Sequence, residues 1–348
     1  MRRVWPPAAA LRSAPAVAVF VVLTVFLAAA PVPARAEVMK IKLATMAPDG
    51  SSWHELLKDL QADWTKASGG RVELRVFAGG VAGDEPVVMK KMGINNYQAA
   101  LISSHGLGTI DKSARVLTVP RMLRNNEELD RALEIMAPEL ERRLDEKGYV
   151  VLFWADAGWI KFFTPSPDAT VQGVKRHRLF SWAGDSEGLD LWKKAGFNVV
   201  PLPATELLTS LQTKMVNAFD TMPYYALASQ AYRHTEYMID MNWAPLPGAL
   251  IMTKIAWTKI PDDLKPVLKE VSAKYAARFR NETRRMDAEA VAAMKERGLR
   301  IVAPTPEVVA EWDKAVEDAY PDFRGYYVSA EDFDWLSGIV KQIRGVAR

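Results

Sequence analysis

Residues 178–223 read RLFSWAGDSEGLDLWKKAGFNVVPLPATELLTSLQTKMVNAFDTMP, and the pattern of this stretch decides the fold. Its apolar runs predict three strands, and helical spacing of apolar residues between them predicts two helices. Asp185 or Ser186 can cap the first helix, because a short oxygen-bearing side chain at that position accepts from the free N–H groups of the first turn. Alternating strands and helices are typical of a layered α/β protein.

The rest of the chain continues this alternation. A helix near residues 261–297 has Pro261 in its first turn and Gly298 after its last turn, which are ordinary end signals. A helix of this length predicts a bridge between two domains. Further strands are expected over 41–45, 71–77, 98–103, 149–155, 160–164 and 299–303. Further helices are expected over about 51–66, 86–93, 126–147, 224–232, 306–319 and 330–344.

The first 36 residues have the pattern of a secretory signal peptide. Three arginines lie among the first twelve residues, residues 16–30 are apolar apart from one threonine, and Ala34-Arg35-Ala36 resembles a cleavage site. The apolar run is shorter than the roughly 20 residues that a membrane-spanning helix needs. We therefore expect cleavage after Ala36 and a periplasmic mature protein, with an uncleaved anchor as the alternative.

Charge and cysteine content exclude several classes of protein. Of the 45 lysines and arginines, four lie in the first 36 residues, so 41 basic side chains remain against 42 acidic ones. Such a balance, without a basic patch, argues against nucleic-acid binding. The chain has no cysteine, which excludes disulfides, thiolate metal sites, a cysteine nucleophile and a lipid-anchored cysteine.

Several ordered stretches resemble the DctP-type solute receptors of TRAP (tripartite ATP-independent periplasmic) transporters. The helical segment KYAARFRNETRR and the helical C-terminal end also fit, so the resemblance covers nearly all of residues 38–345. Besides the stretch quoted above, the resembling stretches are KIKLATMAPDGSSW (40–53), GGRVELRVFAGGVAGDEPVVMKKM (69–92) and QAALISSHGLG (98–108).

The resemblance implies a two-domain α/β fold of the class II-like periplasmic binding type, with hinge strands and a long bridging helix. Domain I would comprise residues 37–156 with about 247–284, and domain II residues 157–246 with about 285–348. The implied function is that of an extracytoplasmic receptor, not an enzyme. It would bind a small organic acid, or an aromatic or related compound, and deliver it to the small and large subunits of a membrane permease. A ligand-sensing module for a signalling partner is the alternative. A monomer without a cofactor is expected.

In this family, the strand that opens the quoted stretch typically carries an arginine that binds a substrate carboxylate. Anchoring the family pattern on Gly173 puts His177 at that position. Anchoring it on the WAGD segment puts Phe180 there, with Arg178 on the same face of the strand. Arg178 is then a surface charge or a ligand clamp. Lys161 resembles the place of a second family arginine, and it is either a carboxylate partner or a solvated strand lysine.

The second half of the chain also supplies aromatic residues that suit a flat or apolar ligand. Phe180 and Trp182 are two residues apart, so we expect them on one face of a strand. Tyr224 and Trp243 are further candidates. Each of these residues is alternatively part of the core.

Polar candidates lie at the predicted strand ends and turns. Asp84 and Glu85 follow glycine turns where related receptors contact their ligand, and they could accept from hydroxyl or amine groups or cap the helix that begins at Pro86. Ser104 and His105 end a predicted strand at the expected cleft edge. Asp220 and Thr221 resemble a turn of the family where an asparagine often meets the substrate.

Enzymatic motifs are weak. Residues 184–188 formally match G-x-S-x-G, but only His234 of the four histidines follows them, which leaves a serine hydrolase as a remote alternative. The segment HELLK at 54–58 lacks the second histidine of a zinc motif, and the chain has no P-loop or dinucleotide pattern. No metal site is expected.

Overall fold

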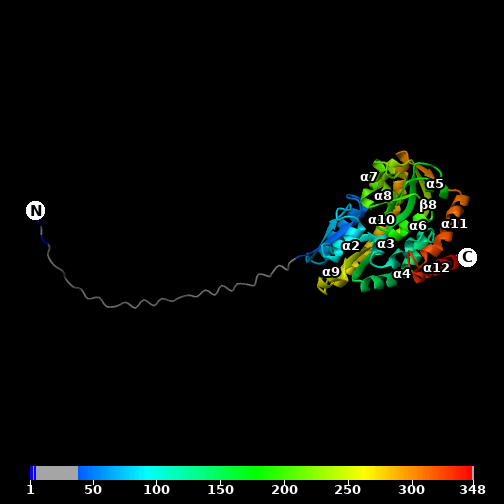
Figure 1. The fold of residues 1–348 in the computed structure, drawn as a ribbon. Coiled ribbons are helices and arrows are strands. Elements are labelled where there is room, and N and C mark those ends of the chain that lie inside the picture. The colour runs from blue at the N-terminus through cyan, green and yellow to red at the C-terminus, as the bar shows by residue number, and fades with distance from the viewer. Residues whose placement is uncertain (3, 5–37, 347–348) are drawn as a thin grey trace. The chain divides into compact units, whose positions relative to one another are not determined.

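The computed structural model describes residues 1, 2, 4 and 38–346, and the chain from Val38 onward forms one compact unit (Figure 1). The predicted signal peptide and the cleavage site after Ala36 lie outside the described residues. No helix in the described part of the chain combines the length and the apolar character that a membrane crossing requires.

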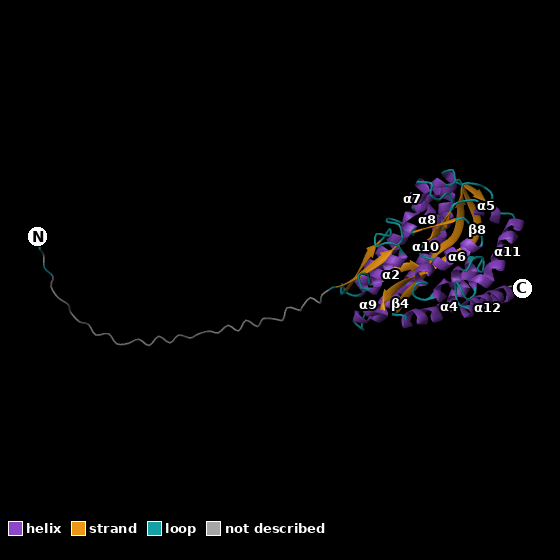
Figure 2. Cartoon of the chain, in the orientation of Figure 1, coloured by secondary structure: helices purple, strands orange, loops and turns teal. Residues whose placement is uncertain are grey.

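A mixed sheet with helices around it forms the centre of the fold (Figure 2). Leu43 and Ala44, consecutive residues of β1, belong to two different apolar clusters, so both faces of the sheet are covered. The strand order is β2-β1-β3-β8-β4-β7, with β9 beside β8, while β5 and β6 form a separate parallel pair. The strands are β1 (Met39–Thr45), β2 (Val72–Phe77), β3 (Ala99–Ser103), β4 (Tyr149–Thr164), β5 (Leu179–Trp182), β6 (Val199–Leu202), β7 (Phe219–Thr221), β8 (Tyr237–Thr253) and β9 (Arg300–Val302).

The helices follow the predicted order with few exceptions. Ser51, at the predicted start of the helix over 51–66, caps α1. Asp185, one of the two predicted candidates, caps α6 by accepting from the N–H of Gly188. The helices are α1 (Ser52–Ala67), α2 (Glu85–Gly93), α3 (Ser104–Leu107), α4 (Asn126–Glu146), α5 (Val171–Lys175), α6 (Ser186–Lys194), α7 (Leu207–Gln212), α8 (Pro223–Ala228), α9 (Lys254–Lys259), α10 (Lys265–Glu296), α11 (Pro306–Phe323) and α12 (Ala330–Val346). The 3₁₀ helices are η1 (Lys112–Thr118), η2 (Ala204–Glu206) and η3 (Ala231–His234).

The long strands β4 and β8 join the two halves of the body. They pair antiparallel from Tyr149 opposite Thr253 to Thr164 opposite Tyr237. β3 attaches to the C-terminal part of β8, whereas β7 and β9 attach at the other end of the pair. The two domain boundaries predicted within these strands face each other, because Asp156 pairs with Pro247. The division into domains itself stays a prediction.

The β4–β8 ladder is irregular at this junction. Its register shifts between Asp156 and Trp159, which is the mark of a β-bulge. Gly158 lies in the bulge with φ +103, and a Cβ atom there would overlap the carboxylate of Asp287 on α10. Only glycine fits this position, because the positive φ and the close approach both exclude a side chain.

The helix α10 is held to α1 by two buried indole hydrogen bonds. Nε1 of Trp53 donates to Oγ1 of Thr283 at 2.8 Å, and Nε1 of Trp64 donates to Oγ of Ser272 at 2.9 Å. Both hydroxyls are completely buried. The predicted bridging helix is therefore anchored at two points about three turns apart.

We predict that Ser272→Ala lowers the free energy of unfolding by about 1–3 kcal/mol, because it leaves the buried N–H of Trp64 without an acceptor. Urea denaturation followed by tryptophan fluorescence measures the change. The control is Ser186→Ala at an exposed position, which should stay within about 0.5 kcal/mol of the unaltered protein. Equal stability of the two variants would contradict the prediction.

Candidate ligand-binding site

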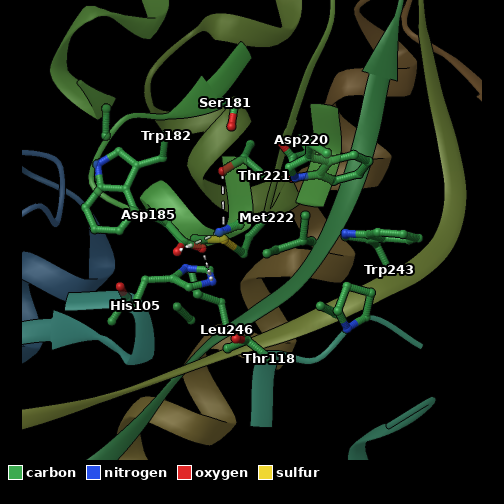
Figure 3. A pocket seen from close by; sticks show the side chains of 18 of the residues that line it. His105, Thr118, Ser181, Trp182, Asp185, Asp220, Thr221, Met222, Trp243 and Leu246 are labelled. Atoms are coloured by element: carbon green, nitrogen blue, oxygen red, sulfur yellow. Dashed lines mark hydrogen bonds and ion pairs between the residues drawn. The ribbon is translucent and has the colours of Figure 1, made fainter. Parts of the chain in front are cut away.

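A cavity of about 550 Å³ lies at the junction of the two halves. Residues of β4, β5, β7 and β8 line it together with the ends of β1 and β3 and the start of α2. A volume of several hundred Å³ is the usual size of a site for a small organic molecule. Figure 3 shows His105 and Trp182 on one side of this cavity and Asp220 and Trp243 on the other.

Most of the predicted site residues line this cavity. Phe180 and Trp182 both do so, and so does Ser181 between them. The predicted residues in the cavity wall are Asp84, Glu85, His105, Phe180, Trp182, Asp220, Thr221 and Trp243.

The two candidate cationic partners of a ligand, Lys161 and Arg178, are not in the cavity wall. Of the two alternatives for Arg178, this position favours the surface charge over the ligand clamp. Nζ of Lys161 donates to Oδ1 of Asp240 at 2.6 Å and to Oδ1 of Asn242 at 3.1 Å. Arg178 is exposed, and its guanidinium donates to two backbone carbonyls between 2.8 and 3.1 Å away. Strand alternation explains the position of Lys161, because its neighbours Ile160 and Phe162 are buried and point to the opposite face.

Two other predicted residues, Ser104 and Tyr224, are also outside the cavity wall. Ser104 is completely buried, and its hydroxyl donates to the carbonyl of Pro247 at 2.6 Å. The Tyr224 hydroxyl accepts from the backbone N–H of Ser52 at 2.7 Å. Both side chains thus make hydrogen bonds to backbone groups of distant segments. The residue after Tyr224, Tyr225, lines the cavity instead.

Asp84 links opposite walls of the cavity. Its Oδ1 accepts from the N–H of Glu85 at the start of α2, so the predicted helix-capping role is confirmed. Its Oδ2 accepts from Nε1 of Trp182 at 2.6 Å and from the backbone N–H of Ala204 at 3.0 Å. One carboxylate oxygen thus joins the turn before α2 to two segments of the other half.

Glu85 supports the loop after β3. Its carboxylate accepts from the backbone N–H and from the hydroxyl of Ser103, each at 2.7 Å. Burial nevertheless raises the pKa of Glu85 to about 7, because these hydrogen bonds offset only part of the lost hydration. A Cβ atom at Gly106 would overlap this carboxylate. Both carboxylate oxygens of Glu85 therefore accept hydrogen bonds from within the protein, so Glu85 has a structural role rather than a ligand-binding one.

His105 lies between an ion-pair network and the ring of Trp182. Its Nε2 is 4.0 Å from Oδ2 of Asp185, and its ring centre is 5.9 Å from that of Trp182. Arg115 pairs with Asp185 at 2.8 Å and with Glu187 at 3.2 Å. Burial lowers the pKa of His105 below its ordinary value, so we assign it the neutral form at pH 7.

Aromatic side chains gather around Trp243, on the side of the cavity away from His105 and Trp182. We call the group of Phe162, Trp192, Phe197, Trp243 and Trp312 the aromatic cluster. The ring centres of Trp192 and Trp243 are 5.3 Å apart in a stacked arrangement, and those of Trp243 and Trp312 are 5.3 Å apart edge to face. All members except Phe162, which is completely buried behind them, line the cavity. Trp192 was not predicted from the sequence, where it lies between Leu191 and two lysines of α6.

Asp220 lies beside this cluster. It pairs with Phe162 across β4 and β7, so the two side chains are on the same face of the sheet. Among the described residues, no other side chain donates a hydrogen bond to its carboxylate or pairs with it. Burial raises the pKa of Asp220 to about 7, and only its own backbone N–H opposes this change.

Positive charge is scarce around the cavity. Within the described part of the chain, no arginine lines it, and the lining lysines are Lys175 and Lys194. Lys194 is already paired with Asp322 at 2.6 Å. The same residues contain no cluster of three or more histidine or carboxylate side chains that could hold a metal ion.

The sequence matches the family described as bacterial extracellular solute-binding protein, family 7 (DctP) over residues 43–325. It is 25% identical over 262 residues to a solute-binding protein of Chromohalobacter salexigens, which covers 72% of each chain. It is 20% identical over 250 residues to the 2,3-diketo-L-gulonate-binding periplasmic protein of Escherichia coli, which covers 70% of this chain and 74% of that one.

Solved structures show the same fold. The sugar acid binding protein of Advenella mimigardefordensis in complex with galactonate superposes with a TM-score of 0.82 at 18% identity, covering 88% of this chain and 98% of that one. A TRAP periplasmic solute binding protein of Sulfurospirillum deleyianum with bound succinate gives a TM-score of 0.79 at 21% identity, covering 87% and 98% of the two chains.

These relatives are binding proteins rather than enzymes. Ser186, the centre of the G-x-S-x-G match, is exposed, and its hydroxyl donates to Glu187 rather than to a histidine. The match to the family covers residues 43–325, which is most of the chain. The two-domain α/β architecture agrees with that of the solved relatives, and the cavity lies at the junction of the two halves. The chain therefore belongs to the DctP family of bacterial extracellular solute-binding proteins, the periplasmic receptors of TRAP transporters.

Proposed function

We propose that the protein is the solute receptor of one particular TRAP system. It would bind a small organic acid, or an aromatic or related compound, in the periplasm and deliver it as a monomer to the small and large permease subunits. The cavity of about 550 Å³ supports this proposal most directly, because residues of both halves line it. The alternative, a sensing module for a signalling partner, would use the same cavity, and no feature of the described residues favours it.

The solved relatives support an organic acid, rather than a neutral compound, as the ligand. Their structures contain galactonate, L-gulonate, D-glucuronate, succinate and pyroglutamic acid. A bound carboxylate needs a cation or several donors, since its unpaired burial costs several kcal/mol. Among the described residues that line the cavity, Lys175 is the cation without a carboxylate partner. An acidic ligand would therefore depend on Lys175.

We infer that binding is coupled to closure of two domains, residues 37–156 with about 247–284 and residues 157–246 with about 285–348. Asp84 belongs to the first domain, and both of its donors from across the cavity, Trp182 and Ala204, belong to the second. A ligand that contacts both walls would favour the closed form over the open one by its difference in affinity for the two forms.

We predict that at least one compound from a panel of aliphatic acids, sugar acids and aromatic compounds stabilises the protein. At 100 times its dissociation constant, a ligand adds about 2.7 kcal/mol to the free energy of unfolding, which a thermal-shift assay detects. Ser181→Trp, which fills the cavity, should abolish the shift. Ser186→Trp, at an exposed position on the neighbouring helix, should retain it. Absence of any shift across the panel, or equal shifts in both variants, would count against the receptor proposal.

We predict that Trp182→Phe favours the open form, because phenylalanine keeps an aromatic ring but cannot donate to Asp84. A hydrogen bond to a charged acceptor contributes about 1.5–3 kcal/mol, so affinity for a compound found in the panel should fall by about tenfold to a hundredfold. Small-angle X-ray scattering of the ligand-free variant should give a larger radius of gyration. Trp335→Phe on α12, outside the cavity wall, serves as the control. Unchanged affinity and scattering of Trp182→Phe would show that the Asp84 contact does not hold the domains closed.

A further inference from the structure

We propose that the cavity selects a monocarboxylic acid with an aromatic body and discriminates against sugar acids and dicarboxylic acids. Its carboxylate would be held on the side of the cavity that carries the aromatic cluster, by Lys175 and by the indole N–H groups of Trp192 and Trp243. This inference rests on the proposed receptor function and narrows its ligand class.

The aromatic cluster offers a continuous apolar wall. Trp192, Phe197, Trp243 and Trp312 line the cavity, and neighbouring ring centres among them are 4.6 to 6.1 Å apart. These rings pack on one another, so a ligand would lie along their exposed edges and faces rather than between them. A flat apolar body makes favourable offset and edge contacts with such a surface.

Two indole N–H groups of this wall are free to donate to a ligand. Nε1 of Trp182 and Nε1 of Trp312 donate to protein oxygens. Nε1 of Trp192 and Nε1 of Trp243 donate to no acceptor among the described residues, and neither belongs to the fully enclosed polar atoms without a partner. Figure 3 shows the nitrogen-bearing edge of Trp243 turned toward the other labelled residues of the cavity. A ligand with acceptor oxygens would satisfy these donors.

Lys175 supplies a single positive charge on the same side. Its ammonium lies 5.1 Å from the ring centre of Phe197, which is 4.6 Å from that of Trp192. A contact with a ring face leaves the charge in place, so the ammonium can still pair with a carboxylate. Lys194, the other lining cation of the described chain, is paired with Asp322 at 2.6 Å. One carboxylate would thus find a partner, whereas a second one would be buried without a partner, which is costly.

Most acidic and hydroxyl side chains of the wall already have hydrogen-bond partners within the protein. They include Asp84, Glu85, Ser103, Thr118, Asp156 and Asp185. The donors that these carboxylates accept from also offset their charge toward an anionic ligand. A sugar acid such as galactonate carries several hydroxyl groups, and few polar side chains remain to replace the water that those groups would lose.

Asp220 differs from these carboxyls, because no other described side chain is paired with it. Burial raises the pKa of Asp220 to about 7, so its uncharged form predominates below that pH and can donate a hydrogen bond. An ordinary carboxylic acid is ionised at about pH 6. At that pH the ligand carries its charge while Asp220 repels it least.

The direct test compares four ligands by isothermal titration calorimetry at about pH 6: 3-phenylpropanoate, phenylsuccinate, 3-phenylpropan-1-ol and galactonate. We expect 3-phenylpropanoate to bind more tightly than each of the others by about tenfold or more. Phenylsuccinate adds a second carboxylate, the alcohol removes the charge, and galactonate lacks the apolar ring.

Variants identify the groups that hold the carboxylate. Lys175→Met should weaken binding of 3-phenylpropanoate by about tenfold or more and change binding of the alcohol by less than about threefold. Lys193→Met, at an exposed position of α6 outside the cavity wall, should leave binding of the acid unchanged. Trp243→Phe keeps an aromatic ring without the N–H and should weaken binding of the acid by about threefold to tenfold. Trp335→Phe is its matched control.

The outcomes separate this inference from the receptor proposal. If galactonate, succinate or phenylsuccinate binds and 3-phenylpropanoate does not, the inference is wrong and the receptor proposal stands. Equal binding of the alcohol and the acid would also overturn the inference, and so would unchanged binding of the acid in both Lys175→Met and Trp243→Phe. If none of these compounds and no compound of the wider panel binds, both proposals fail.

Discussion

The pairing of β4 with β8 is the constraint on which the rest of the structure depends. These strands run through both halves of the body, and outside the irregular positions their buried backbone groups are partners for each other. β3, with β1 and β2 beyond it, attaches at one end of this pair, and β7 and β9 attach at the other. The cavity lies beside the junction, where residues of both strands line it. The bulge, Gly158 and the carboxylates of Asp156 and Asp287 lie at this junction.

The electrostatics of the cavity differ from the charge pattern that the family resemblance implies. That pattern depends on an arginine on the strand corresponding to β5, and β5 here offers Phe180, Ser181 and Trp182. The nearby guanidinium of Arg115 is already paired with Asp185 and Glu187 and stacks on Tyr327, 4.7 Å from the ring centre. Family membership therefore predicts the position of the site but not the charge of its ligand.

The sequence predicted the elements whose local chemistry is strong. Helix caps and helix end signals are short-range patterns, and those of this chain lie within a few residues of their predicted places. Examples are the caps Ser51, Asp84 and Asp185 and the ends of α10. The strand β8 was missed because Pro245 and Pro247 lie within it, and proline normally argues against a strand. The structure accommodates both prolines opposite the irregular part of β4, where the ladder does not require every N–H.

The candidate site was predicted less completely, because sequence spacing gives the strand that carries a residue but not what that residue meets. Phe180 and Trp182 could be placed on one face, but whether this face borders a cavity depends on distant segments. The partners of Lys161, Asp240 and Asn242, lie about 80 residues away along the chain. Trp192 enters the site because its ring stacks on Trp243 of β8, a contact between distant segments that no local pattern reveals.

Asp84 has a consequence for the kinetics of release. Both of its contacts across the cavity end on the same oxygen, Oδ2. Displacement of this carboxylate breaks both contacts in one movement, whereas displacement of β5 or of the segment at Ala204 breaks only one of them. In the proposed closure, movement of the Asp84 turn would therefore be the shortest route to release of a solute.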